Sequence, residues 1–335
     1  MSMPFCIRIP KKEGESVRSR LIDADLLDNR YRIRADGDYL IVPVLCDSFE
    51  GYEAAEYEAE ERTARPVDYK EVLDFPDWLA EELPNSFDVI GDIALIKLTE
   101  VLLPYKERIG EAMIEVSPSI RAVMLDDGVK GELRVRKLEK IAGAGTSETV
   151  HKEFGTKIAT DPSLVYFNPR LAGERAGTAL EVKKGETIID MFAGVAPFPV
   201  VISKLARPEI IYAIDLNPEA ERFMKKNIEL NDAECIVPII GDAREAVKGL
   251  PPADRIIMNL PQSSEDFLDS ALDSAKPGAT IHLHRVLERT EKEDFVKNLI
   301  DIAEAAGCGI SIIRTSELKT YSPTMSVYVF DIVKD

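Results

Sequence analysis

The spacing of apolar and polar residues differs between the first and second halves of the chain. In the first half, residues 5–10 (FCIRIP) alternate, residues 14–27 have helical spacing, and residues 37–45 (GDYLIVPVL) are apolar enough for a strand. This pattern predicts a small α+β domain over residues 1–65. Its acidic residues 47–62 are expected to form a linker or an exposed helix.

A second α+β domain is predicted over residues 66–150. Residues 87–98 (FDVIGDIALIKL) contain two short strand-like runs on either side of Gly91 and Asp92. A helix candidate follows at residues 104–116. We expect this middle domain to pack on the domain that comes after it.

Residues 151–335 alternate between strand-like and helix-like segments. The strand-like runs are residues 187–190, 210–215, 235–240, 254–260 and 279–284. Two further runs, 309–318 and 326–333, are joined by a short connection, as in an antiparallel hairpin. The predicted fold class is therefore α/β, with a doubly wound, mostly parallel sheet that ends in an antiparallel hairpin. Such sheets bind ligands beyond the carboxyl ends of their strands.

Composition indicates a globular protein. The chain has 335 residues, of which 45% are apolar and 30% charged, which is enough for more than one core. No apolar run approaches the roughly 20 residues of a membrane span, and the first residues contain no apolar leader. The four cysteines are scattered without a CxxC pair, so neither a metal site nor a disulfide framework is predicted. We expect a cytoplasmic protein without a metal, and a monomer because no coiled-coil pattern is present.

The charge distribution leaves two interpretations open. A net charge of −18 argues against a general nucleic-acid coat protein, because phosphate binding needs a local positive potential. Residues 130–175, however, hold nine Lys and Arg against six Asp and Glu. They form either one basic surface on an acidic protein or a solvated face of mixed charge.

Side chains that can hold a ligand follow four successive strands of the predicted sheet. After the first strand, DMFAGVAPF (190–198) contains Asp190, Phe192 and Gly194, and the glycine lets the backbone approach a ligand closely. Asp190 has a local alternative as a helix or turn cap. A single glycine matches the GxGxxG fingerprint of dinucleotide binding poorly.

The next three strands end in similar candidates. Asp215 comes 21 residues after Gly194, where a carboxylate accepts hydrogen bonds from ribose hydroxyls. Asp242 is placed to receive an adenine amino group, and Asn259 and Pro261 follow the fourth strand. Turn formation is the alternative for Asp215 and Asn259, and helix capping is the alternative for Asp242. Their joint occurrence at strand ends favours a nucleoside-bearing cofactor.

Several motifs resemble a known family. DMFAGVAPF (190–198), YAIDLNP (212–218) and MNLP (258–261) resemble S-adenosylmethionine-dependent methyltransferases in order and spacing. Upstream, GELRVRKLEKIAG (131–143) and VYFNPRLAGERAG (165–177) narrow this to a resemblance to the archaeal and eukaryotic tRNA (guanine-37-N1)-methyltransferase family. The segments CIRIPKKEGE and SFDVIGDIALIKL are similar to that family's first two domains.

The resemblance implies a fold, a cofactor and a partner. Residues 151–335 would be a Rossmann-like methyltransferase domain that binds S-adenosylmethionine, and the two smaller domains would grip tRNA. Ala196 departs from the family pattern, which more often has glycine there. We expect its methyl group to tighten the cofactor turn without removing a functional group.

The resemblance also implies residue roles. Glu174 falls at the position of the family's catalytic glutamate and would remove the proton from guanine N1. Arg134 resembles the arginine that contacts the guanine, where it would stabilise negative charge on O6. Asn259 would hold the base through its amide, and Pro261 would stiffen that loop. Tyr166 resembles an active-site tyrosine near the cofactor and the base.

Four arginines are predicted to contact tRNA: Arg134, Arg136, Arg170 and Arg175. Local ion pairs remain the alternative for Arg170 and Arg175, including a helix-surface pair between Glu174 and Arg175. Elsewhere in the chain, His282 and His284 are expected to be structural. Residues 318–323 (LKTYSP) are a candidate border of the target-base pocket.

Three rival functions remain. A related enzyme of the wyosine pathway transfers the aminocarboxypropyl group of S-adenosylmethionine to the same tRNA position. It has no N1 proton to remove, so Glu174 together with Arg134 favours the methyltransferase. A nicotinamide oxidoreductase is disfavoured by the single-glycine loop, and a catalytically silent RNA-binding protein would lack the base or Asn259.

Overall fold

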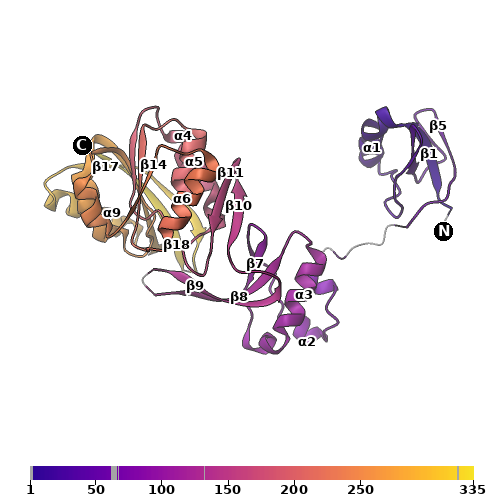
Figure 1. The fold of residues 1–335 in the computed structure, drawn as a ribbon, viewed down its shortest axis with the longest axis horizontal. Helices are drawn as coiled ribbons and strands as arrows, with labels where there is room; N and C mark the ends of the chain where they lie inside the picture. Colours follow the sequence, from indigo (N-terminus) through magenta and orange to yellow (C-terminus); the bar gives the residue numbers. More distant parts are fainter. Residues whose placement is uncertain (1–2, 62–65, 67, 132, 323) are drawn as a thin grey trace. The chain divides into compact units, whose positions relative to one another are not determined.

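A computed structural model describes the chain except at residues 1–2, 62–65, 67, 132 and 323. The chain divides into two compact units, Met1–Glu71 and Val72–Asp335 (Figure 1). In the described part of the chain, no helix is both long and apolar enough to cross a membrane.

An antiparallel sheet and one α-helix make up most of the N-terminal unit. Its elements are β1 (Phe5–Pro10), η1 (Lys11–Glu13), α1 (Gly14–Asp23), β2 (Arg34–Asp36), β3 (Tyr39–Pro43), β4 (Ser48–Phe49), β5 (Tyr52–Glu56) and η2 (Tyr69–Glu71). The strands lie in the order β2-β3-β1-β5-β4. Ile7 and Ile9 of β1 and Val17 and Leu21 of α1 are buried in its core, as their alternating and helical spacing requires.

The acidic residues 47–62 are not a linker or a helix. Their described part forms the β4–β5 hairpin, and β5 pairs with β1 at the sheet centre. Tyr52 and Ala54 alternate toward the core of the unit, while the acidic Glu53 and Glu56 between and beyond them are exposed. Phe49 of β4 packs against the same core, and together these apolar contacts outweigh the charge of the segment.

The second unit begins with a smaller sheet. Its elements are α2 (Asp77–Ala80), β6 (Asp88–Ile90), β7 (Ile93–Ile96), η3 (Glu100–Tyr105), α3 (Lys106–Val116), β8 (Ala122–Lys130) and β9 (Val135–Gly143). The strands lie in the order β6-β7-β8-β9, with β7 and β8 parallel. The predicted strand pair around Gly91 and Asp92 is β6 and β7, and the predicted helix is α3.

After the smaller sheet, the chain forms a two-stranded hairpin and then a larger sheet. Its further elements are β10 (Thr149–Glu153), β11 (Thr156–Thr160), η4 (Pro169–Leu171), α4 (Ala172–Glu181), β12 (Thr187–Asp190), α5 (Pro197–Leu205), β13 (Ile210–Asp215), α6 (Ala220–Asn231), β14 (Ile236–Ile240), α7 (Ala243–Ala246), η5 (Val247–Gly249), β15 (Ala253–Met258), η6 (Ser264–Phe267), α8 (Leu268–Ser274), β16 (Ala275–Glu288), α9 (Lys292–Ala305), β17 (Ile310–Thr320) and β18 (Met325–Lys334). The hairpin contacts the smaller sheet, since the Gly91 amide donates to His151 and the Asp92 amide to Thr149.

The larger sheet confirms the predicted α/β class. Its strand order is β14-β13-β12-β15-β16-β18-β17. Pairing is parallel from β14 to β16 and antiparallel from β16 to β18 and from β18 to β17. The chain moves outward from β12 to β14 and then returns to β15 on the other side of β12. The switch point therefore lies at the carboxyl ends of β12 and β15, where ligands bind in such sheets.

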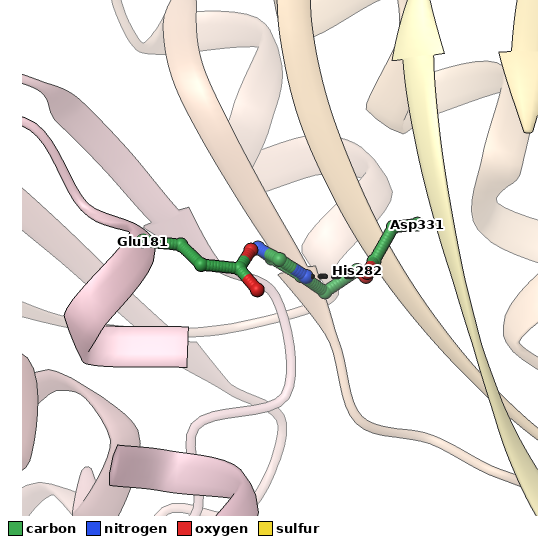
Figure 2. A group of neighbouring side chains, drawn as sticks. All are labelled: Glu181, His282 and Asp331. Carbon is green, nitrogen blue, oxygen red and sulfur yellow. Dashed lines mark hydrogen bonds and ion pairs between the residues drawn. The ribbon is translucent and has the colours of Figure 1, made fainter. Parts of the chain in front are cut away.

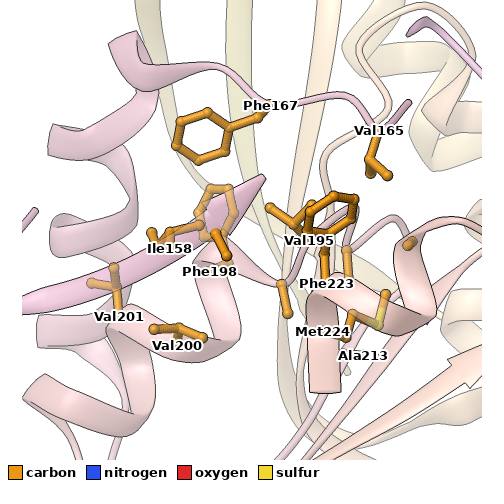
Figure 3. Close-up of a cluster of buried hydrophobic side chains, with 14 of the residues drawn as sticks. Ile158, Val165, Phe167, Val195, Phe198, Val200, Val201, Ala213, Phe223 and Met224 are labelled. Carbon is orange, nitrogen blue, oxygen red and sulfur yellow. The ribbon is translucent and has the colours of Figure 1, made fainter. Parts of the chain in front are cut away.

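Two apolar cores cover the two faces of the larger sheet. Neighbouring residues of β12 face opposite ways: Ile188 joins the core under α5 and α6, and Ile189 joins the core under α8 and α9. Figure 3 shows the first core, where Phe198 of α5 and Phe223 of α6 lie among aliphatic side chains. Burial on both faces explains why these strands are nearly continuous apolar runs.

Candidate active site

A cavity of about 330 Å³ opens at the carboxyl ends of the parallel strands. The predicted site residues that line it are Arg134, Tyr166, Phe192, Gly194, Asp215, Asp242 and Asn259. They come from six separate stretches of sequence. Those at the ends of β12 to β15 meet because parallel strands end at the same edge of a sheet. Six other predicted residues do not line it: Arg136, Arg170, Glu174, Arg175, Asp190 and Pro261.

The turn after β12 is held in place by Asp215. The Gly194 amide donates to Oδ2 of Asp215 at 2.6 Å, and the Asn217 amide donates to Oδ1 at 2.9 Å. Gly194 has φ of 56°, and a Cβ there would lie 3.0 Å from the carbonyl oxygen of Tyr166. Glycine is therefore favoured by conformation, and a Cβ there would be crowded by the Tyr166 carbonyl. Each Asp215 oxygen keeps a lone pair, so the carboxylate is still able to accept hydrogen bonds from a ligand.

Ala196 adopts the conformation for which glycine is the usual residue. Its φ of 63° and ψ of 42° are left-handed, and its side chain is fully buried at the start of α5. A left-handed L-residue costs roughly 1–2 kcal/mol, so the departure from the family pattern falls on a strained position.

Asp190 lies outside the cavity lining and is buried. Its Oδ1 accepts a hydrogen bond from the Phe192 amide at 3.3 Å, while Oδ2 has no hydrogen-bond partner among the described residues. Burial raises the pKa of Asp190 to about 8, and the nearby Asp215 carboxylate contributes. The structure thus places Asp190 as a support of the turn rather than as a cavity-lining group.

Asp242 is engaged by a neighbouring arginine. It caps α7 by accepting the Arg244 amide at 2.9 Å, and the Arg244 guanidinium binds both carboxylate oxygens at 3.1 and 2.6 Å. The hydrogen bond from Arg244 lowers the pKa of Asp242. Capping, the alternative predicted for this residue, therefore occurs in a residue that also lines the cavity.

The predicted Phe192 has an aromatic neighbour in the cavity, Phe267, that was not predicted. The rings of Phe192 and Phe267 meet edge to face at 4.9 Å, and the Arg244 guanidinium lies 4.8 Å from the centre of the Phe267 ring. All three line the cavity, where the face of an aromatic ring is able to contact a planar ligand. Arg244 was detectable as the residue two positions after a capping aspartate, but Phe267 has no local signal.

The loop after β15 presents a free amide. The Asn259 side chain lines the cavity and forms no hydrogen bond to a described residue. Ser264 ties the loop down, because its hydroxyl lies 2.6 Å from the Leu260 carbonyl oxygen and 2.7 Å from that of His284. Pro261 also anchors the loop, since its carbonyl oxygen accepts the Val286 amide at 2.6 Å.

Arg134 and Tyr166 contact each other in the lining. The Arg134 guanidinium lies 5.1 Å from the centre of the Tyr166 ring, within the range of a cation–π contact. The Arg134 backbone has φ of 54°, and its buried Nε has no hydrogen-bond partner among the described residues.

Glu174 lies in the first turn of α4, with 15% of its side chain exposed. Its Oε1 is 3.7 Å from Nε2 of His284, and the described residues offer it no hydrogen bond. Its place outside the cavity lining leaves the role of general base as a prediction.

Arg175 is not available to tRNA. Only 1% of its side chain is exposed, and its guanidinium binds both oxygens of Glu153 at 2.6 Å each. It also donates to the carbonyl oxygen of Asn168. The predicted tRNA contact is therefore wrong for Arg175, and so is the alternative pair with Glu174, because α4 turns this side chain inward against β10.

The other predicted arginines form a basic cluster with one lysine. We call Arg134, Arg136, Arg170 and Lys319 the basic cluster. Arg170, 58% exposed, binds Asp88 at 2.7 Å, and Arg136 pairs with Asp126 and Asp88. Burial lowers the pKa of Lys319, and the Arg170 charge lowers it further. Lys319 falls in the candidate border 318–323, of which residue 323 lies outside the described residues.

A second polar cluster is structural. Figure 2 shows Glu181 of α4, His282 of β16 and Asp331 of β18. Each has a nitrogen or oxygen atom of the kind that binds metals, and these atoms lie within 4.8 Å of one another. The His282 ring accepts from Arg255 at 2.6 Å, so its other nitrogen donates to Asp331 at 2.7 Å. Arg314 binds both Glu181 and Asp331. Two guanidinium groups already occupy the positions that a cation would need.

Comparison with known proteins decides the family. The model described as "TRM5/TYW2 methyltransferase domain" matches residues 149–312, the "tRNA methyltransferase 5 N-terminal domain" matches residues 6–53, and the "TYW2 N-terminal domain" matches residues 69–146. The chain is 39% identical to tRNA (guanine(37)-N(1))-methyltransferase Trm5b of Pyrococcus abyssi, over 96% of each chain. It belongs to the TRM5/TYW2 methyltransferase family.

Two further similarities within the TRM5/TYW2 family are informative. A solved complex of aTrm5 with tRNALeu superposes with a TM-score of 0.76 at 32% identity, covering 99% of this chain and 100% of that one. The tRNA(Phe) (4-demethylwyosine(37)-C(7)) aminocarboxypropyltransferase of Pyrococcus horikoshii is 30% identical over 78% of this chain and 95% of its own. The resemblance seen in the sequence motifs is confirmed.

Proposed function

We propose that this protein transfers the methyl group of S-adenosylmethionine to N1 of guanosine at position 37 of tRNA. The observation that carries the proposal is the cavity at the strand ends. It combines the Gly194–Asp215 turn, which suits a nucleoside, with Arg134 and Asn259, which suit a purine. Membership of the TRM5/TYW2 family and the near full-length similarity to a Trm5b enzyme support the same reaction.

The cavity fits the cofactor of this family. Because Gly194 has no Cβ, the backbone of its turn would lie close to the bound cofactor. Asp215 retains lone pairs for ribose hydroxyls, and Phe192 and Phe267 provide aromatic rings for contact with adenine. When bound, S-adenosylmethionine supplies an electrophilic methyl group on a sulfonium. No metal is needed for this transfer, and the chain has only to orient the base and remove its proton.

Three side chains of this protein would act on the target guanine. Glu174 would accept the proton from N1, and the electron pair of the broken N1–H bond would then attack the methyl carbon. Arg134 would place its guanidinium at O6, where negative charge develops as the proton leaves. Asn259 would hold the purine edge through its unpaired amide. Glu174 does not line the cavity, so this role requires the guanine to extend past the cavity toward α4.

Glu174→Gln tests the assignment of the base. Its amide keeps the shape of the side chain but cannot take the N1 proton, so we expect the single-turnover rate to fall at least about tenfold. Transfer of radiolabelled methyl groups to tRNA with guanosine at position 37, with chromatography of the product nucleosides, measures it. Glu181→Gln, on the same helix, is the matched control and should stay within about twofold. An unchanged rate in Glu174→Gln would remove the assignment while leaving the reaction.

The aminocarboxypropyl transferase remains the alternative function, because residues 69–146 match the TYW2 N-terminal domain. The two reactions leave different carbons on tRNA. Label from the methyl group of S-adenosylmethionine should reach N1-methylguanosine, whereas label from the aminocarboxypropyl carbons should not reach tRNA. The reverse result would establish the alternative.

tRNA is the partner that this proposal requires. We propose that the basic cluster contacts its backbone beside the target base, and that the predicted N-terminal domains at residues 1–65 and 66–150 hold the tRNA body. Monomeric action in the cytoplasm stays a prediction, which light scattering of the purified protein tests for the oligomeric state.

A further inference from the structure

His284 occupies a fixed and buried position on β16. Its side chain is 0% exposed, and its ring meets that of Phe198 edge to face, with 6.0 Å between the centres. Figure 3 shows Phe198 inside the apolar core under α5. The backbone of His284 is held on two sides, since its carbonyl oxygen receives the Ser264 hydroxyl and its strand pairs with Val329 of β18. The imidazole therefore has little freedom to move away.

Neither ring nitrogen of His284 has a hydrogen-bond partner among the described residues. An unsatisfied buried polar atom loses its hydrogen bonds to water without replacement, so such atoms are uncommon without a reason. His282 provides the contrast, because it lies two residues earlier on the same strand, is equally buried, and has both nitrogens bonded to Arg255 and Asp331. A purely structural role explains the hydrogen bonds of His282, but it does not explain why a histidine with two unpaired nitrogens lies at position 284.

The carboxylate of Glu174 approaches His284. Nε2 lies 3.7 Å from Oε1, just beyond hydrogen-bond length, and Glu174 has no hydrogen bond to a described residue. A small rotation of the carboxylate closes this gap. A carboxylate has two oxygens, so one is able to accept an imidazole N–H while the other faces a guanine.

We propose that His284 is a positioning residue that fixes the carboxylate of Glu174 for proton abstraction from guanine N1. This rests on the proposed function, in which Glu174 is the base. With guanine bound, Nε2–H of the neutral imidazole donates to Oε1, and Oε2 receives the N1 proton. The N1–H electron pair forms the bond to the methyl carbon, the sulfur–methyl pair stays on sulfur, and the proton leaves Glu174 for water after product release. His284 gains and loses no proton in the cycle.

Three substitutions at His284 separate this role from packing. His284→Phe keeps a ring against Phe198 and removes both nitrogens. His284→Gln places an amide N–H near the position of Nε2, and His284→Asn places one near Nδ1. We expect His284→Phe to lower the single-turnover rate about tenfold, with KM for tRNA and for S-adenosylmethionine within about twofold of wild type. The single-turnover rate of His284→Gln should be at least about threefold higher than that of His284→Phe, and the rate of His284→Asn should be no higher than that of His284→Phe.

Two further measurements test the connection to Glu174. In a Glu174→Gln background, His284→Phe should slow the reaction by less than about twofold, because positioning has no value without the carboxylate. Thermal unfolding should show no loss of Tm in His284→Phe, since it removes unsatisfied atoms from the core. His282→Phe is the control for core damage and should lower Tm, because it leaves Asp331 and Arg255 without their shared partner.

The outcomes distinguish the failure of each proposal. If Glu174→Gln is slow and His284→Phe retains the wild-type rate, the positioning role is wrong and the base assignment stands. If Glu174→Gln retains the wild-type rate, the base assignment falls and the positioning role falls with it. Additive losses in the double variant, or a His284→Phe defect that Asn corrects as well as Gln, would also overturn the inference.

Discussion

At the scale of single residues, Asp190 is a group whose environment strongly changes its chemistry. Its pKa is raised from 3.8 to about 8 by burial. Between these pH values the unfolded chain has lost this proton and the folded chain has kept it. The contribution of Asp190 to stability is therefore complete below about pH 4 and is lost as the pH rises through 8, with a limiting slope of roughly 1.4 kcal/mol per pH unit.

Asp190→Asn tests this linkage. The amide resembles the protonated carboxyl in shape but does not ionise, so the variant should gain stability relative to wild type as the pH rises from 5 to 8. We expect a relative gain of at least about 1 kcal/mol over that range, measured by urea unfolding at several pH values. A difference between the two proteins that stays constant with pH would contradict it.

Many of the residues that line the cavity were recognisable in the sequence, but which side chains are buried was not. Gly194, Asp215 and Asn259 were recognisable because each lies at or just beyond the carboxyl end of a strand, and these ends meet at one edge of the sheet. The inward side chain of Arg175 could not be predicted, since its partner Glu153 lies on a hairpin 22 residues earlier in the chain. Phe267 was also missed, because it ends η6, a 3-10 helix too short to have a periodic pattern of its own.

At the scale of elements, the loop between β15 and η6 depends on one hydroxyl. Oγ of Ser264 is fully buried and lies close to the carbonyl oxygens of Leu260 and His284, which connects the Asn259 loop to β16. Ser264→Ala should lower the free energy of unfolding by about 1–2 kcal/mol and slow methyl transfer several-fold, because the amide of Asn259 is then held less firmly. Urea unfolding and single-turnover assays measure both effects.

Ser270→Ala is the control for this loop. The Ser270 hydroxyl contacts only an exposed Asp269 carboxylate among the described residues, at 3.3 Å, so its removal should change stability by less than about 0.5 kcal/mol. A Ser264→Ala protein with the wild-type rate would mean that the loop is fixed by its anchor at Pro261 instead.

Elements with a strong period were predictable, and those defined by their neighbours were not. The five parallel strands are apolar runs long enough to be read directly. The β4–β5 hairpin was mistaken for a linker because its acidic residues dominate the local composition, while its pairing with β1 joins residues about 50 positions apart. Long-range pairing of this kind has no signature in a short window of sequence.

At the scale of the whole molecule, an acidic chain with net charge −18 carries its basic cluster beside the cavity. Binding of tRNA therefore needs additional contacts, and the N-terminal unit is the candidate for them. Removal of residues 1–71 should weaken tRNA binding at least about tenfold while leaving the Kd for S-adenosylmethionine within about twofold, because the cavity lies wholly in the second unit. Filter binding and calorimetry measure the two affinities. Equal losses in both would indicate damage to the second unit.

The hydrogen bonds of His282 have a spectroscopic consequence. Arg255 is able only to donate, so the imidazole is held as the tautomer that carries its proton on Nδ1, and Asp331 accepts that proton in the interior of the sheet. A nitrogen-bound proton so enclosed exchanges slowly with solvent and should give a separate downfield resonance in the spectrum of ¹⁵N-histidine-labelled protein. Its disappearance during heating would mark the moment at which β18 leaves β16. The chain therefore contains its own label for the pairing of β16 with β18.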